Sequence, residues 1–135
     1  MVGTLHLLVA TPERQLVDED VSRIELPGKT GYIGILPEHA PLLSELGAGV
    51  LSYGSEAQER FLAVDGGFVE VLENEVRVLA ERAEFGTDIN LEQARRAVED
   101  AQARVEKPEP QTDTEKTLAE LRGAQARLEA AERAR

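Results

Sequence analysis

The spacing of apolar residues changes once along this chain of 135 residues, and that change limits the folds open to it. In the front part apolar side chains alternate, as at Leu5, Leu7 and Val9, which is typical of a strand with one buried face. From Leu91 they recur every three or four residues, as on one face of a helix. The change falls at Gly86–Asn90, so we predict an all-β domain over residues 1–87 and a helical domain over residues 88–135.

The front part predicts an antiparallel sandwich or a flattened barrel. Further alternating sets are Ile24 and Leu26, Val69 and Val71, and Val76, Val78 and Ala80. Glu73-Asn74-Glu75 separates the last two sets and predicts a hairpin with a short polar turn. Most glycines stand between such runs, and short strands at close spacing favour a two-layered β-fold.

The rear part predicts two helices. Asn90 is a candidate N-cap for a helix from Leu91 to about Glu106, and 107–111, with two prolines, break it. Thr112 or Asp113 can cap a second helix, whose apolar face is Leu118, Leu121, Ala124 or Gln125, Leu128 and Ala131. A short break between two helices favours an antiparallel hairpin.

Alanine supplies about half of the apolar stripe of this hairpin. An alanine side chain buries little apolar area, and isolated helices of this length are marginal in water. We therefore expect the hairpin to be held loosely, and to be able to leave its folded position and extend along another protein.

Composition excludes several classes of function. The net charge is −11, and residues 1–90 carry six Lys/Arg against sixteen Asp/Glu, so this part would repel nucleic acid and anionic lipid. There is no cysteine, which excludes disulfides and thiolate metal sites. No stretch approaches the roughly 20 apolar residues that cross a bilayer, and the first residues lack a basic segment. We expect a soluble or peripheral protein without bilayer insertion.

Residues 31–43 predict two short strands that meet at a stiff corner. Pro37 and Pro41 exclude a helix, because each lacks an N–H and fixes its own φ. The corner presents Glu38 and His39, which either fix the turn through backbone hydrogen bonds or meet a partner. A general-base role for His39 is the less favoured alternative.

No catalytic or metal-binding constellation stands out. The sequence has no GxxxxGK[ST], HExxH or GxSxG pattern, and His6 and His39 are its only histidines. His6 lies in an alternating segment and is interpreted as a surface residue of a strand. The arginines of the rear part favour ordinary i,i+4 pairing with Glu or Asp, with an anion site between the helices as the alternative. We therefore predict a protein that is not an enzyme and holds no metal.

Two motifs, together with their setting, resemble the epsilon subunit of the F-type ATP synthase. The first runs from Ile24 through Pro27-Gly28 and then from Thr30 to Leu43, and includes Gly31, Gly34 and His39-Ala40-Pro41. The second is Gly66-Gly67-Phe68-Val69-Glu70-Val71, followed by Asn74-Glu75-Val76 and Leu79-Ala80. The resemblance covers nearly the whole chain, and the two motifs in combination are highly specific.

The resemblance implies a β-sandwich of about ten strands, a C-terminal two-helix hairpin and a place in the rotor of the enzyme. In that family the sandwich binds the gamma subunit and rests on the loops of the c-ring. The hairpin lies folded on the sandwich or extends into the alpha/beta catalytic head, where it inhibits ATP hydrolysis. The expected location is peripheral, on the cytoplasmic face of a bacterial inner membrane or the stromal face of a thylakoid.

The resemblance also implies candidate site residues. For contact with the c-ring and gamma these are Lys29, Tyr32, Glu38 and His39. Some members bind ATP through I/L-D-x-x-R-A, which here reads Leu91-Glu92-Gln93-Ala94-Arg95-Arg96, with Glu for Asp and Arg96 for Ala. The nucleotide candidates are therefore Glu92, Arg95 and Arg127, and we expect no cofactor beyond weak ATP binding. An ATP-sensing module is the alternative function.

Overall fold

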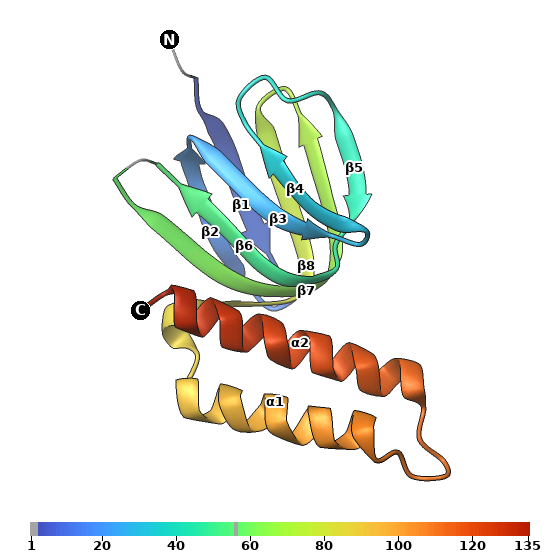
Figure 1. The fold of residues 1–135 in the computed structure, drawn as a ribbon. Helices are drawn as coiled ribbons and strands as arrows, with labels where there is room; N and C mark the ends of the chain where they lie inside the picture. Colours follow the sequence, from blue (N-terminus) through green and yellow to red (C-terminus); the bar gives the residue numbers. More distant parts are fainter. Residues whose placement is uncertain (1–2, 56) are drawn as a thin grey trace.

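The computed structural model describes residues 3–55 and 57–135, which form a β-sandwich followed by a helical hairpin (Figure 1). The predicted fold class is confirmed. The strands are β1 Leu5–Ala10, β2 Gln15–Val21, β3 Arg23–Gly28, β4 Gly31–Ile35, β5 Leu42–Glu45, β6 Ala48–Gly54, β7 Glu59–Leu72 and β8 Glu75–Phe85. The helices are the 3-10 helix η1 Gly86–Asp88 and the α-helices α1 Leu91–Glu106 and α2 Thr114–Arg133.

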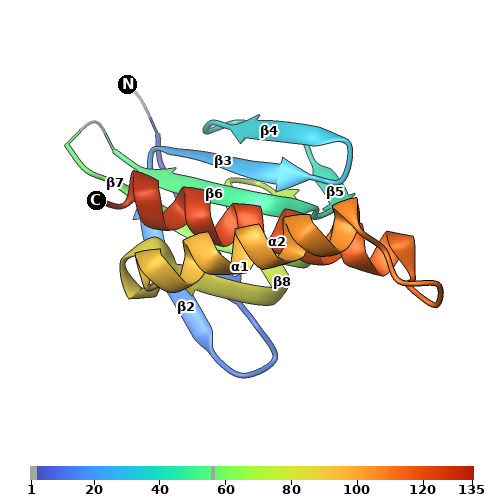
Figure 2. The same ribbon diagram turned by 60° about the horizontal axis from the view of Figure 1, so that its bottom comes forward.

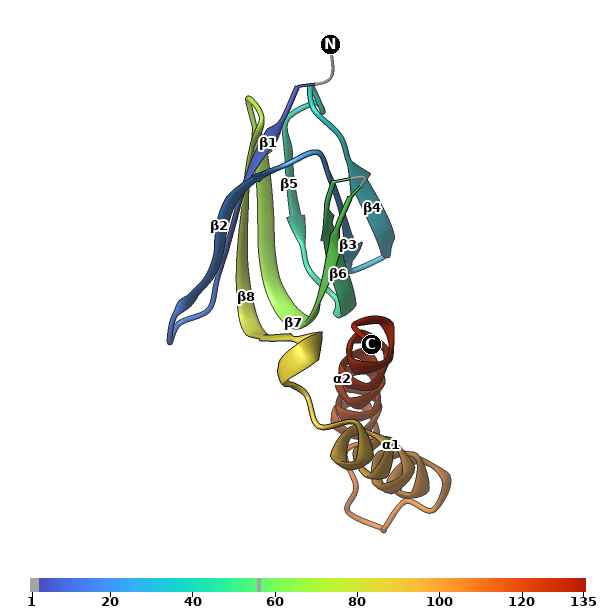
Figure 3. The same cartoon turned by 90° about the vertical axis from the view of Figure 1, so that its left-hand side faces the viewer.

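The strands form one sheet that folds over on itself. Its order is β2-β1-β8-β7-β6-β3-β4, with β5 paired to β7. All pairs are antiparallel except β1 with β8. Figure 3 shows the two layers, with β7 passing between them at the end nearest the helices.

The strand number in the described residues is eight, where the resemblance implied about ten. Part of the difference lies in the length of β7, which has 14 residues and takes the place of two shorter strands. Gly66 and Gly67, at φ 74° and 111°, let it bend in a conformation that side-chain-bearing residues rarely adopt. One strand therefore pairs with β6 before the bend and with β5 after it, and serves both layers.

The core between the layers includes the alternating residues that the sequence indicated, together with others such as Leu51 and Tyr53. Leu5, Leu7 and Val9 of β1 are fully buried. So are Val69 and Val71 of β7, which face the core beside Val76 and Val78 of β8. The hairpin between β7 and β8 closes at Glu73 and Asn74, whose positive φ angles are those of a tight hairpin turn.

The helices begin where the sequence predicted. The side chain of Asn90 accepts a hydrogen bond from the N–H of Gln93 at 3.0 Å and caps α1. Of the two candidates for α2, Asp113 is the cap and accepts from Lys116 N–H at 3.1 Å. The hydroxyl of Thr112 instead accepts from Glu109 N–H in the connecting loop at 2.8 Å.

Helix α2 lies between α1 and the sheet, along β6 and β7 (Figure 2). It consequently has two contact faces, and the sequence indicated only one. Ala126 and Ala130, which were not on the predicted apolar face, are buried together with Ala131. They were missed because small side chains leave little trace in a periodic pattern.

Candidate functional site

The corner between β4 and β5 is tied to the turn between β7 and β8. Glu38 has φ 69°, and its N–H donates to the Asn74 side-chain oxygen at 2.7 Å. The Asn74 amide donates back to the Glu38 carboxylate at 3.1 Å. His39 donates its N–H to the carbonyl of Leu36 at 3.1 Å, and its Nδ1 lies 2.7 Å from the carbonyl of Ala40. The corner thus presents an exposed carboxylate and a partly exposed imidazole on a fixed backbone.

The structure places the other two candidates for partner contact at the opposite end of β4. Lys29 forms an ion pair with Glu45 at 2.9 Å. The hydroxyl of Tyr32 accepts a hydrogen bond from the N–H of Val50 at 2.9 Å, although half of its side chain is exposed. The four residues therefore form two separate surfaces, Lys29 with Tyr32 and Glu38 with His39, and their contacts with partners stay predictions.

A surface that sequence reasoning missed lies on the outside of the layer formed by β5, β7, β8 and β1. Phe68 and Leu79 are directly opposite each other in the β7–β8 register, and both are more than half exposed. Leu43, 73% exposed, and Leu72 lie on the neighbouring outward positions of β5 and β7. We call these four residues the outer apolar face.

A groove of about 360 Å³ continues this face toward β1, where Ala10 and Pro12 line it beside Phe68 and Leu79. Exposed apolar patches of this kind, bordered by charged residues, mark interaction surfaces. The signal was not visible in the sequence, because only the pairing of β7 with β8 and β5 brings these residues together.

His6 also lies on the outward side of β1, in contact with two carboxylates of β2. Its Nδ1 is 2.8 Å from Asp20 and its Nε2 is 2.6 Å from Asp18. Carboxylate oxygens only accept, so both ring nitrogens carry protons in this arrangement. The hydrogen bonds to Asp20 and then Asp18 raise the pKa of His6 above its ordinary value. This matches the interpretation of His6 as a surface residue of a strand.

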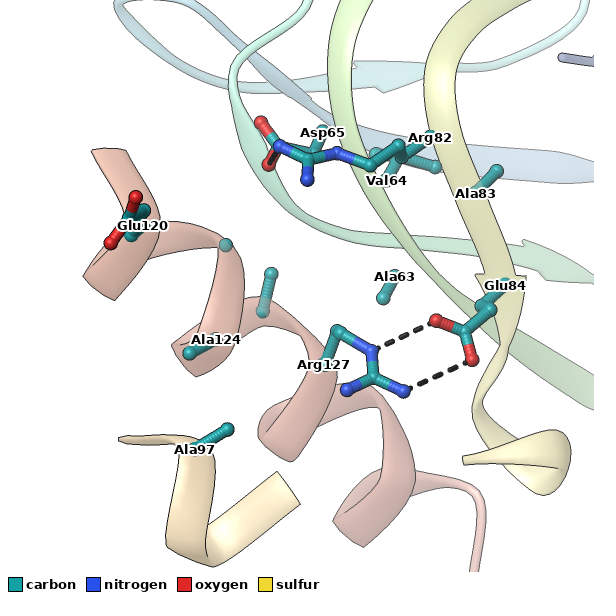
Figure 4. A pocket seen from close by; sticks show the side chains of 12 residues that line it. Ala63, Val64, Asp65, Arg82, Ala83, Glu84, Ala97, Glu120, Ala124 and Arg127 are labelled. Carbon is teal, nitrogen blue, oxygen red and sulfur yellow. Dashed lines mark hydrogen bonds and ion pairs between the residues drawn. The ribbon is translucent and has the colours of Figure 1, made fainter. Parts of the chain in front are cut away.

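The nucleotide candidates are not gathered in one cavity. Glu92 and Arg95 pair with each other at 3.2 Å in the first turn of α1. Arg127 of α2 instead donates two hydrogen bonds, at 2.8 and 3.2 Å, to the carboxylate of Glu84 on β8 (Figure 4). The cavity beside Arg127 holds about 230 Å³, and neither Glu92 nor Arg95 lines it. Nucleotide binding by the three residues stays a prediction.

Residues 3–55 and 57–135 contain no group of three or more His, Cys, Asp or Glu side chains placed to hold a metal ion. In the same residues no helix is long and apolar enough to cross a membrane.

Two family models together match almost the entire chain. The model of the β-sandwich domain of the ATP synthase Delta/Epsilon chain matches residues 4–86. The model of the long α-helix domain of the same chain matches residues 87–132. The two matches meet in the linker between β8 and α1.

Relatives that match over nearly their full length are ATP synthase epsilon chains. The ATP synthase epsilon chain of Solibacter usitatus is 45% identical and covers 98% of this chain and 99% of its own length. That of Moorella thermoacetica is 41% identical, with 96% and 98% covered. In fold, the chain is similar to one in the Euglena gracilis mitochondrial ATP synthase, with a TM-score of 0.81 and 23% identity over 96% of this chain and 81% of that one. The resemblance read from the two motifs is thereby confirmed, and this chain belongs to the ATP synthase Delta/Epsilon family, among the epsilon chains.

Proposed function

We propose that this chain is a rotor subunit in the central stalk of a proton-translocating F-type ATP synthase. There it couples ring rotation to ATP synthesis and inhibits ATP hydrolysis through its C-terminal helices. As an epsilon chain it is a non-catalytic subunit of the complex. The observation that supports the proposal best is the combination of one exposed apolar face on the sandwich with a hairpin that packs through small side chains.

The outer apolar face is our candidate for the docking site of the gamma subunit. Its four large side chains stand in a sheet that already has a complete core, so they contribute little to folding in water. Burial against a partner would release their hydration, at about 25 cal/mol per Å² of apolar area. The face borders the helices at one end, where Phe68 lines a cleft with Ala119 and Arg122 of α2, and the helices lie at the end of the sandwich where β7 bends (Figure 1).

The corner with Glu38 and His39 is our candidate for the contact with the c-ring loops. Its backbone is fixed by the reciprocal bonds between Glu38 and Asn74, so it can transmit force without rearranging. Replacing Glu38 by Lys should lower proton-coupled ATP synthesis in membranes while leaving the sandwich folded. Glu38→Gln is the matched control, since it keeps an acceptor for Asn74; full synthesis with Glu38→Lys would refute this assignment.

The hairpin is our candidate for the inhibitory element. Helices α1 and α2 have 16 and 20 residues and rise about 1.5 Å per residue, and we propose that the extended hairpin contacts the alpha/beta catalytic head. The test is ATP hydrolysis by the assembled complex with the full chain and with a chain lacking residues 91–135. We expect hydrolysis to rise on truncation, and an unchanged rate would leave only the structural role.

The proposed location is peripheral, on the cytoplasmic face of a bacterial inner membrane, held there by gamma and the c-ring. An acidic sandwich is unsuited to direct binding of anionic lipid, since residues 1–90 have a large excess of Asp and Glu. Attachment should therefore depend on the partner subunits. Membranes that lack gamma should release the chain into the soluble fraction.

A further inference from the structure

On the side of α2, the buried contact with the sandwich is made largely by alanines. Ala126, Ala130 and Ala131 are buried, and Ala130 and Ala131 share a cluster with Ala63 and Val50 of the sheet. Small side chains allow close approach but bury little apolar area. This contact therefore permits docking of the helix without fixing it strongly.

Three arginines make directional contacts that hold α2 to the end of the sandwich nearest the helices. They lie in the last turns of α2 and in the residues after it. Arg127 holds the Glu84 carboxylate with two hydrogen bonds, the fork geometry that makes such pairs strong and specific. Arg133 stacks over the Phe61 ring at 4.6 Å.

Arg135 makes the third set of contacts, with backbone carbonyls of the linker. Its guanidinium donates to Gly86, the first residue of η1, at 3.1 Å and to Ile89, the residue after η1, at 2.7 Å. It also donates to Ala131 of α2 at 2.7 Å. The guanidinium thus joins the last turn of α2 to the segment that must rotate if the hairpin swings away.

If the hairpin swung away at the linker, the groups that these hydrogen bonds join would be separated. Glu84 is the second-last residue of β8, the strand that leads directly into η1. Arg127 lies on α2. Helix α1 is on the far side of α2 from the sheet (Figure 3). Release of α2 would therefore free both helices together.

The cavity beside Arg127 does not offer an uncompensated positive charge. Its lining carries Arg82 and Arg127 but also Asp65, Glu84 and Glu120. Arg82 pairs with Asp65 at 3.0 Å, and Arg127 pairs with Glu84. A phosphate group entering this cavity would have to displace a carboxylate from each arginine that it reached.

We propose that Arg127 on Glu84 and Arg135 on the linker carbonyls form an intramolecular clasp, and that this clasp, rather than a bound nucleotide, sets the ratio of folded to open hairpins. The clasp deepens the proposed function, because it matters for regulation only if the open hairpin inhibits hydrolysis. It adds that the folded state of this chain is held by its own side chains.

The test is hydrogen exchange on the full-length protein, read at the α2 amides 126–131, with the sandwich amides as internal reference. Glu84→Arg and Arg127→Glu should each speed exchange of these amides about tenfold, the size expected for loss of a partly exposed two-bond ion pair. The double swap Glu84→Arg/Arg127→Glu should restore slow exchange. Glu99→Arg and Arg96→Glu, on the exposed side of α1, make the same charge changes away from the clasp and should leave exchange unchanged.

Mg-ATP added to the unmodified protein should leave exchange of the α2 amides unchanged. The clasp is refuted if either single swap leaves their exchange as slow as in the unmodified protein, if the double swap fails to restore it, or if Mg-ATP slows it. Hydrolysis by complexes carrying the single swaps tests the proposed function separately. Faster exchange without any change in hydrolysis would refute inhibition by the hairpin while leaving the clasp intact.

Discussion

Gly86, at the start of the linker, lies very close to the backbone of α2. A Cβ placed there would collide with the carbonyl oxygen of Ala130 and would lie 2.9 Å from Ala134 Cβ. Glycine is therefore required at this position because a side chain would not fit, and not because of the φ angle. Gly86 also forms part of the linker that Arg135 holds.

Replacing Gly86 by Val should push α2 away from the linker, at a cost of about 1–3 kcal/mol in docking free energy. Hydrogen exchange should become faster at Ala130 and Ala131 and stay slow in β1 and β8. Gly34→Ala is the control, because nothing lies within 4 Å of the added Cβ. Equal protection of α2 in both variants would contradict the importance of this close approach.

His6 gives the sandwich a pH-dependent element. Because hydrogen bonds to Asp20 and Asp18 raise the pKa of His6 above 6.5 in the folded state, its protonated form stabilises folding. That contribution is complete below about pH 6.5 and is lost as the pH rises through the folded-state pKa. NMR titration of the imidazole should show the raised pKa, and Asp18→Asn/Asp20→Asn should bring it back toward its ordinary value. An unchanged titration curve in that double variant would disprove the assigned cause.

At the scale of elements, the strands and helix caps could be predicted because their signals are local. Alternation placed Leu5, Leu7 and Val9 in the core, and the Asn90 cap fixed the start of α1. Features that require distant segments to meet could not be predicted from the sequence. Arg127 and Glu84 are 43 positions apart, and no periodic pattern links them. The pairing of Phe68 with Leu79 likewise needs the register of β7 and β8.

Helix α1 packs on α2, and α2 packs on the sheet, so we expect the hairpin to need its contact with the sandwich for stability. The contact between the two helices includes the buried Ala94 and Ala101 of α1, and a helix of 16 or 20 residues is marginal in water without further burial. A peptide of residues 88–135 should therefore be largely non-helical by circular dichroism at 25 °C. The full-length chain provides the reference spectrum. A peptide with helix content close to that of the intact protein would show that the hairpin is stable alone.

At the scale of the molecule, the three proposed contact surfaces lie on different parts of the sandwich. The bend of β7 and the linker hold the hairpin at one end, and the outer apolar face lies on the outside of one layer. The candidate contact at Glu38 is at the end of β4 away from the Lys29 turn. Changes to one proposed surface should therefore leave the others functional.

Leu79→Glu tests this separation. It places a charge in the middle of the outer apolar face, where docking of gamma would have to desolvate it, and we expect affinity for gamma to fall roughly 30- to 150-fold, or about 2–3 kcal/mol. Stability of the isolated chain should hardly change, since Leu79 is 56% exposed there. Gln58→Glu, in the exposed β6–β7 loop, makes the same change in charge and should keep full affinity. Titration of gamma with each variant measures the affinity of Leu79→Glu and of Gln58→Glu. Equal affinities would mean that gamma binds the sandwich on another side.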